Sequence, residues 1–283
     1  EIAHIARLFV ERYGVTKMRV TGGEPLLRAD VAGIVGDLLG LGIEVGLTTN
    51  ALLLHHHLEA LWGAGLRSVN VSLDTFETER FRRIARRDGL DTVERNIRLA
   101  LDRGLRVKVN MVVMRGVNDD ELLRFVALTK HAALHVRFIE FMPFAGNGWG
   151  REHVFTYAEM LERIGAQHPI EKLTDDPHST AKAYRVTDWP GTFAVISTVT
   201  EPFCGNCDRL RLTAEGKMRN CLFAREETDL LTPLRNGADI APLIEANVLT
   251  KRAMLGGLPP FRAEAQRAVL EDLSPRPMVS IGG

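Results

Sequence analysis

The sequence predicts an α/β fold built on a parallel sheet, with a complete or partial (βα) barrel as the preferred architecture. Stretches of strand and helix character alternate over the first 141 residues, at roughly thirty residues per unit. The strand stretches are rich in valine and show little polar alternation, which is typical of parallel strands buried on both faces. Polar residues gather where these strands end, the edge at which α/β sheets place their sites. A doubly wound open sheet is the second architecture compatible with the pattern.

The first element is an amphipathic helix over residues 2–13, because apolar residues recur at helical spacing from Ile2 to Val10 and Gly14 follows. Since the chain begins with Glu1 rather than Met and opens inside a helix, we expect that it has lost its beginning. The same reasoning places strands at 17–21, 43–48, 68–73, 106–113 and 135–141, and helices at 30–40, 52–63, 91–103 and 119–131.

A glycine-rich loop over residues 146–150 ends this alternation. We therefore expect two domains, a partial barrel over residues 1–145 and a small α+β extension over residues 146–283. In the extension the pattern predicts helices at 156–165, 237–250 and 260–265, and strands at 182–187, 192–198, 209–213 and 217–221. Within the barrel, the arginine-rich run from Arg80 to Arg87 is expected to be a basic surface turn.

The composition excludes several classes of protein. The 283 residues carry 36 basic and 36 acidic side chains, so no basic excess indicates nucleic acid as a partner. No apolar run is long enough to cross a membrane. The three cysteines are odd in number and clustered, which favours a reducing cytoplasm over a disulfide scaffold.

Those cysteines form the strongest motif in the chain. Cys204, Cys207 and Cys221 have the spacing C-x2-C-x13-C, and thiolates are preferred ligands of zinc and of iron–sulfur clusters. Arg209 and Arg211 lie between them at the i, i+2 spacing that places both side chains on one face of a strand, which indicates an anionic ligand such as a phosphate. The motif alone leaves a zinc knuckle and an iron–sulfur cluster equally open, although no fourth cysteine exists to complete a zinc site.

Charged residues also lie in the middle of the predicted barrel strands. Arg19, Lys108 and Arg137 are costly there unless that face borders a wet, ligand-filled interior. The three cations together predict a polyanion inside the barrel. At the end of the first strand, Gly22 and Gly23 lack side chains and allow the backbone to approach a ligand.

With these residues in view, the sequence closely resembles the GTP 3′,8-cyclases of molybdenum cofactor biosynthesis, a family of radical S-adenosylmethionine (SAM) enzymes. The resemblance runs along essentially the whole chain. Its motifs are Thr21-Gly-Gly-Glu-Pro-Leu-Leu-Arg28, Thr48-Thr-Asn50, Asn70-Val-Ser-Leu-Asp74, Lys108-Val-Asn110, Arg137-Phe-Ile-Glu-Phe-Met142, the three cysteines and the terminal Gly282-Gly283. The Gly-Gly-Glu-Pro motif alone would imply only the radical SAM superfamily, whereas its combination with the cysteine spacing and the Gly-Gly end is specific.

The resemblance implies a partial (βα)6 barrel of the radical SAM type with two [4Fe–4S] clusters. The N-terminal cluster reductively cleaves SAM, the resulting 5′-deoxyadenosyl radical abstracts hydrogen from C3′ of GTP, and this carbon attacks C8 of guanine. The product is a cyclised GTP that a downstream cyclic pyranopterin monophosphate synthase consumes. An electron donor is also implied, a homodimer is compatible with the family, and neither nucleic acid nor membrane is expected as a partner.

The resemblance also assigns roles to individual residues. Cys204, Cys207 and Cys221 would hold the C-terminal cluster, and Gly282 and Gly283 would reach into the active site as catalytic residues. The expected GTP-binding residues are Arg19, Thr48, Lys108, Arg137, Arg209, Leu210 and Arg211. The expected SAM-binding residues are Gly22, Gly23, Glu24, Ser72 and Met142.

The sequence departs from the family in one respect, because the CxxxCxxC motif of the SAM cluster is absent from the 283 residues. We expect that this motif and the first barrel strand precede the present start, and that the chain as given does not cleave SAM. Two alternatives remain, another radical SAM enzyme with an auxiliary cluster and a zinc-containing nucleic-acid-binding module. Tight GTP binding would distinguish the cyclase from the first alternative. Bound zinc with salt-dependent RNA or DNA affinity would indicate the second alternative.

Overall fold

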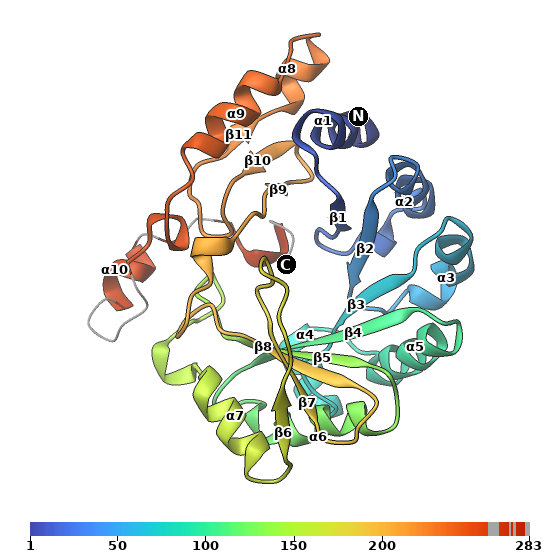
Figure 1. Cartoon of the computed structure of the whole chain (residues 1–283), viewed down its shortest axis with the longest axis vertical. Helices are drawn as coiled ribbons and strands as arrows, with labels where there is room; N and C mark the ends of the chain where they lie inside the picture. Colours follow the sequence, from blue (N-terminus) through green and yellow to red (C-terminus); the bar gives the residue numbers. More distant parts are fainter. Residues whose placement is uncertain (260–265, 272, 274–275, 281–283) are drawn as a thin grey trace. The chain divides into compact units, whose positions relative to one another are not determined.

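The structure is a computed structural model that describes residues 1–259, 266–271, 273 and 276–280 (Figure 1). It consists of two compact units that alternate along the chain. The first unit comprises Glu1–Met111, Arg124–Arg137 and Asp188–Phe193, and the second comprises Val112–Leu123, Phe138–Thr187 and Ala194–Gly283. The domain boundary expected near residue 146 stays a prediction.

Eight strands form the main sheet, in the order β1-β2-β3-β4-β5-β8-β7-β6. Their bounds are β1 Lys17–Val20, β2 Glu44–Thr49, β3 Ser68–Ser72, β4 Arg106–Val113, β5 His135–Glu140, β6 Ile170–Lys172, β7 Lys182–Val186 and β8 Thr192–Ile196. The first four strands pair in parallel, whereas β6 and β7 pair antiparallel. A second, three-stranded sheet has the order β11-β10-β9, with β9 Arg211–Leu212, β10 Lys217–Arg219 and β11 Thr228–Asp229.

The helices of the first unit follow the strands in the βα order that the periodicity predicts (Figure 1). The α-helices of the chain are α1 Ile2–Tyr13, α2 Val31–Leu39, α3 Leu54–Gly63, α4 Thr78–Ala85, α5 Leu90–Asp102, α6 Leu122–Ala127, α7 Tyr157–Gly165, α8 Leu231–Arg235, α9 Ala241–Leu249 and α10 Gln266–Glu271. Short 3-10 helices are η1 Pro25–Leu27, η2 Asp119–Glu121, η3 Leu128–Lys130, η4 Arg151–His153, η5 Cys204–Asn206, η6 Leu255–Gly257 and η8 Met278–Ser280.

The predicted fold class is confirmed, but β4 is not buried on both faces as expected. Its side chains alternate, with Val107, Val109 and Met111 fully buried and Lys108 and Asn110 only half-buried on the opposite face. One face of the sheet therefore packs against helices, and the other carries polar groups.

Several local predictions need correction. The run from Arg80 to Arg87 is largely helical, because α4 covers residues 78–85 and buries Phe81. Carboxylates pair with two of its arginines: Glu77 lies 3.2 Å from Arg80, and Arg82 pairs with Glu79 and Asp88.

The other differences concern the ends and partners of elements. The helix predicted at 119–131 is divided into η2, α6 and η3, and the one at 237–250 shrinks to α9, preceded by a separate α8. Strand β8, expected in the extension, belongs to the main sheet, and β6 was not predicted. The helix predicted at 260–265 lies outside the described residues.

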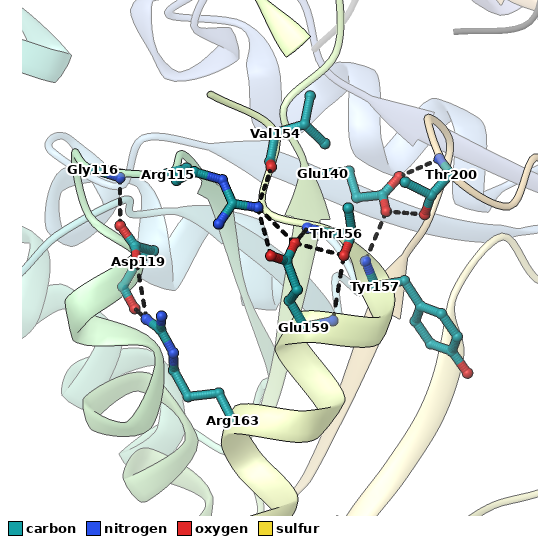
Figure 2. Close-up of polar contacts among 10 residues, drawn as sticks. All are labelled: Arg115, Gly116, Asp119, Glu140, Val154, Thr156, Tyr157, Glu159, Arg163 and Thr200. Atoms are coloured by element: carbon teal, nitrogen blue, oxygen red, sulfur yellow. Dashed lines mark hydrogen bonds and ion pairs between the residues drawn. The ribbon is translucent and has the colours of Figure 1, made fainter. Parts of the chain in front are cut away.

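Glu140, at the end of β5, anchors two other segments of the second unit (Figure 2). Its carboxylate is fully buried and accepts hydrogen bonds from the backbone N–H groups of Tyr157 (2.9 Å), Val199 (2.7 Å) and Thr200 (2.9 Å), and from the Thr200 hydroxyl. The start of α7 and the turn after β8 are thus fixed to the end of β5. Each of the two buried oxygens accepts two of these hydrogen bonds.

The first turn of α7 is held by a second group of contacts (Figure 2). Thr156 and Glu159 form a reciprocal capping box, and Arg115 donates to both Glu159 oxygens at 2.6 and 2.7 Å and to the Val154 carbonyl at 2.9 Å. Burial raises the pKa of Glu159, but the hydrogen bonds from Arg115 and Thr156 outweigh it and bring that pKa to about 2.

Candidate functional site

A row of polar side chains crosses the first four strands of the first unit. The parallel register places Thr48 opposite Asn70, and Asn70 opposite Lys108. With its amide oxygen turned toward β1, Asn70 accepts from Arg19 Nε (3.3 Å) and Nη1 (3.1 Å) and from Thr48 Oγ1 (3.1 Å). Asn70 therefore holds the Arg19 guanidinium beside Thr48. Sequence reasoning quoted Asn70 only as part of a motif, and its role as an acceptor for Arg19 depends on strand order.

The charges on this face are of one sign and influence one another. Burial, together with the charges of Arg137, Arg19 and Lys17, lowers the pKa of Lys108 to about 8 against the opposing effect of Glu44. The part of this shift that comes from neighbouring cations indicates a positive local potential, which an anionic ligand would relieve.

His135, two residues before Arg137 on β5, belongs to the same environment. Burial lowers its pKa to about 3, with further contributions from Arg137 and Lys108, so the imidazole is neutral at physiological pH. Its Nδ1 lies 2.7 Å from the Thr192 hydroxyl. The sequence analysis did not single out His135. Its position two residues before Arg137, which places both side chains on one face of β5, is the signal that could have found it.

The turn that follows β1 is shaped by Glu24. Its carboxylate accepts from the backbone N–H groups of Leu26 (3.0 Å) and Asn50 (2.8 Å) and from the Thr49 hydroxyl (2.7 Å). These bonds tie the ends of β1 and β2 together. Gly22 before it has φ 137°, a backbone conformation that favours glycine.

The cysteines of the second unit all carry free thiols and are half-buried. Burial raises the pKa of Cys204, opposed by a hydrogen bond from Leu255 N at 3.3 Å and reinforced by Cys221 and Cys207. The three sulfurs therefore influence one another. Burial also raises the pKa of Cys207, but hydrogen bonds from Arg209 and the charges of Arg209 and Lys251 outweigh it, so its pKa lies below the ordinary value.

Two arginines border these thiols. Arg209 is exposed, with its guanidinium carbon 5.3 Å from the centre of the Phe203 ring. Arg211, on β9, is half-buried, and burial together with the charge of Arg209 lowers its pKa to about 10, so it stays cationic at neutral pH. In the described part of the chain, no three His, Cys, Asp or Glu side chains form a ligand set for a single metal ion.

The remaining predicted site residues are placed as follows. Gly23 and Ser72 are exposed, Leu210 is half-buried, and Met142 packs beside the apolar cluster that contains Phe141 and Phe144. Gly282 and Gly283 lie outside the described residues. Lys251 and Leu255, which contact Cys207 and Cys204, were missed because no local motif marks them.

Two family profiles match the chain, one in each half. Residues 1–129 match the radical SAM superfamily, and residues 134–254 match the family described as Molybdenum Cofactor Synthesis C. Among solved structures, the chain is similar in fold to SuiB of Streptococcus suis bound to S-adenosylmethionine, with a TM-score of 0.63 at 13% identity over 88% of this chain and 61% of that one.

Several curated relatives are similar in sequence. "GTP 3′,8-cyclase, mitochondrial" of Arabidopsis thaliana is 41% identical over 100% of this chain and 72% of its own length, and "GTP 3′,8-cyclase" of Thermodesulfovibrio yellowstonii is 38% identical over 100% of this chain and 86% of its own. "Molybdenum cofactor biosynthesis protein 1" of Mus musculus is 45% identical over 100% of this chain. The chain spans only 44% of that mouse protein's length, and 42% of the human protein of the same name.

None of the helices within the described ranges combines the length and the apolar character that a membrane crossing requires.

Proposed function

Because the chain belongs to the GTP 3′,8-cyclase family, we propose that it acts in the radical SAM-dependent cyclisation of GTP to (8S)-3′,8-cyclo-7,8-dihydroguanosine 5′-triphosphate, the first step of molybdenum cofactor biosynthesis. The reaction also requires the CxxxCxxC motif that these 283 residues lack. The names of the plant and bacterial relatives support this proposal, and their matches cover 72% and 86% of the relatives' own lengths. In this reaction the C3′–H bond of GTP breaks and a bond forms between C3′ and C8.

The observation that carries the proposal is the cationic face of the first unit. Burial is the main cause of the lowered Lys108 pKa of about 8, and the charges of Arg137 and Arg19 add to it; a triphosphate supplies the matching negative charge for these cations. We assign Arg19, Thr48, Lys108 and Arg137 of this unit to GTP binding. Arg209, Leu210 and Arg211 of the second unit are assigned to the same ligand.

The radical SAM family implies a [4Fe–4S] cluster and SAM as cofactors. When bound, such a cluster supplies the electron that cleaves SAM. Its CxxxCxxC ligands are not among these 283 residues. For SAM itself we assign Gly22, Gly23, Ser72 and Met142 as contacts. Glu24 belongs to this set, and its three internal hydrogen bonds favour a role in shaping the turn that presents Gly22 and Gly23.

We assign Cys204, Cys207 and Cys221 to a second, C-terminal [4Fe–4S] cluster. Three free, mutually interacting thiols, one with a lowered pKa, are a donor set that fits such a cluster. A cluster held by three cysteines leaves one iron available to a ligand, and the bordering Arg209 and Arg211 favour an anionic one.

The proposal extends to partners and compartment. It requires an electron donor and a downstream cyclic pyranopterin monophosphate synthase, is compatible with a homodimer, and places the reaction in the cytoplasm. Gly282 and Gly283 are proposed to act at the active site.

Replacing Arg211 with alanine is expected to weaken GTP binding by about tenfold or more, because one charge-assisted contact to phosphate is lost. Iron content per chain is expected to stay at the wild-type level, since the three thiols are untouched. Equilibrium GTP binding and iron analysis on the reconstituted protein test both statements, with Arg151→Ala, an exposed arginine on η4, as the control. Loss of iron with unchanged GTP affinity would overturn the assignment of Arg211.

A further inference from the structure

One short segment of the second unit, residues 247–256, contacts Cys204, Cys207 and the residue before Cys221. It comprises the end of α9 and the turn that follows, and it begins 26 positions after Cys221, the nearest cysteine in the chain.

Lys251 holds the segment that contains Cys207. Its Nζ donates to the carbonyl oxygens of Cys207 (2.7 Å) and Arg209 (3.2 Å), and it lies 3.9 Å from the Cys207 Sγ. An ammonium group has three N–H donors, and all three distances lie within hydrogen-bonding range for their acceptors. Lys251 therefore fixes the backbone from which the Cys207 and Arg209 side chains project.

Leu255 and Gly256 hold Cys204 and the turn after Cys221. The Leu255 N–H donates to Cys204 Sγ at 3.3 Å. Leu255 is buried at φ 49°, and Gly256 follows at φ 65° with no room for a side chain, because a Cβ there would lie 2.8 Å from the Ala224 nitrogen. Two successive left-handed residues against a neighbouring backbone indicate a conformation that its surroundings enforce.

Asn247 and Thr250 hold Asn220, the residue before Cys221. Asn220 Nδ2 donates to the Asn247 carbonyl (2.6 Å) and to Thr250 Oγ1 (3.2 Å). Asn247 in turn donates to Thr228 Oγ1 at 2.7 Å, and both asparagines are buried. A buried polar network of this kind fixes one arrangement of the elements that it joins.

From these contacts we infer that Lys251 is a positioning residue that holds Cys207 and Arg209 in place, as a half-buried member of a brace formed by residues 247–256. The inference rests on the proposed function only in naming the bound group as an iron–sulfur cluster. Hydrogen bonds and positive charge next to cluster sulfurs stabilise the reduced cluster. Lys251 thus also sets the reduction potential of a cluster at these thiols.

The experiment compares Lys251→Met with Lys251→Arg, which keeps cationic N–H donors, and with Lys172→Met as a matched control. Lys172 also donates to a backbone carbonyl, that of Leu173 at 2.6 Å, and pairs with Asp175. Three quantities are measured on the full chain: hydrogen exchange of amides 204–211 before reconstitution, the rate of iron loss to a chelator after reconstitution, and the midpoint potential of the cluster.

In Lys251→Met we expect faster exchange over residues 204–211, a cluster retained on the order of tenfold less well, and a lower midpoint potential. In all three measurements Lys251→Arg is expected to lie closer to the wild type than Lys251→Met does. Lys172→Met is expected to give the wild-type values. If Lys251→Met and Lys172→Met behave alike in exchange and iron loss, the inference is wrong. If the wild-type chain takes up no cluster, the proposed function fails, and hydrogen exchange alone then decides for or against the brace.

Discussion

Lys108→Met is expected to weaken GTP binding by about 100-fold, or about 2.7 kcal/mol, which is the largest effect on ligand affinity that we predict. Lys108 is half-buried in the middle of β4, so water screens its charge less than that of a surface lysine. Methionine keeps the unbranched apolar part of the side chain and removes the ammonium group with its charge and N–H donors. Equilibrium titration with GTP under anaerobic conditions measures the change.

Lys17→Met is the matched control. Lys17 lies on β1 of the same sheet, but it is exposed and pairs with Glu44 at 3.0 Å. Its removal is expected to change GTP affinity by less than about threefold, as for an exposed ion pair. Equal effects of the two substitutions would contradict the assignment of Lys108.

The pH dependence of GTP binding tests the same residue independently. In the free protein the pKa of Lys108 is about 8, and a bound phosphate would raise it by favouring the charged form. Binding above pH 8 therefore requires proton uptake, so GTP affinity is expected to fall as pH rises through this range. In Lys108→Met this decline should disappear, and a pH profile identical to wild type would show that another group titrates.

Glu140→Gln is expected to lower the free energy of unfolding of the second unit by about 3 kcal/mol, the largest stability effect that we predict. The carboxylate accepts four hydrogen bonds, and Gln replaces one accepting oxygen with an NH₂ group that faces buried backbone N–H donors. Each buried donor that loses its acceptor costs about 1–3 kcal/mol.

Denaturant unfolding of the variant against Glu162→Gln checks this prediction. Glu162 is an exposed residue of α7, and its substitution is expected to change stability by less than about 0.5 kcal/mol. If both variants unfold at the wild-type denaturant concentration, Glu140 does not anchor the end of β5.

Local periodicity explains why most elements of the first unit could be predicted from the sequence. Strand β4 was predicted with its observed bounds of 106–113, because Val107 and Val109 alternate with Lys108 and Asn110 and the apolar run 111–113 follows. The information for this strand lies within a few neighbouring residues. The strand predicted at 209–213 is shorter than expected, because β9 covers only Arg211–Leu212 and Arg209 lies outside it.

The predictions that failed depend on contacts that are distant in the sequence. Charge suggested a turn at the arginine-rich run, whereas the buried Phe81 and the acidic partners of its arginines support a helix. Lys251 lies 44 residues from Cys207, and no pattern at that separation predicts a hydrogen bond between them. Strand β8 joined the main sheet for the same reason, since pairing partners of strands are not encoded locally.

The most direct test of the central claim is the metal content of this chain after anaerobic reconstitution with iron and sulfide, followed by addition of GTP. We predict about four irons per chain from the three-cysteine cluster, a brown protein, and a cluster spectrum that GTP perturbs. One tightly bound zinc, no iron, and no response to GTP would contradict the account and would instead favour a zinc-containing binding module.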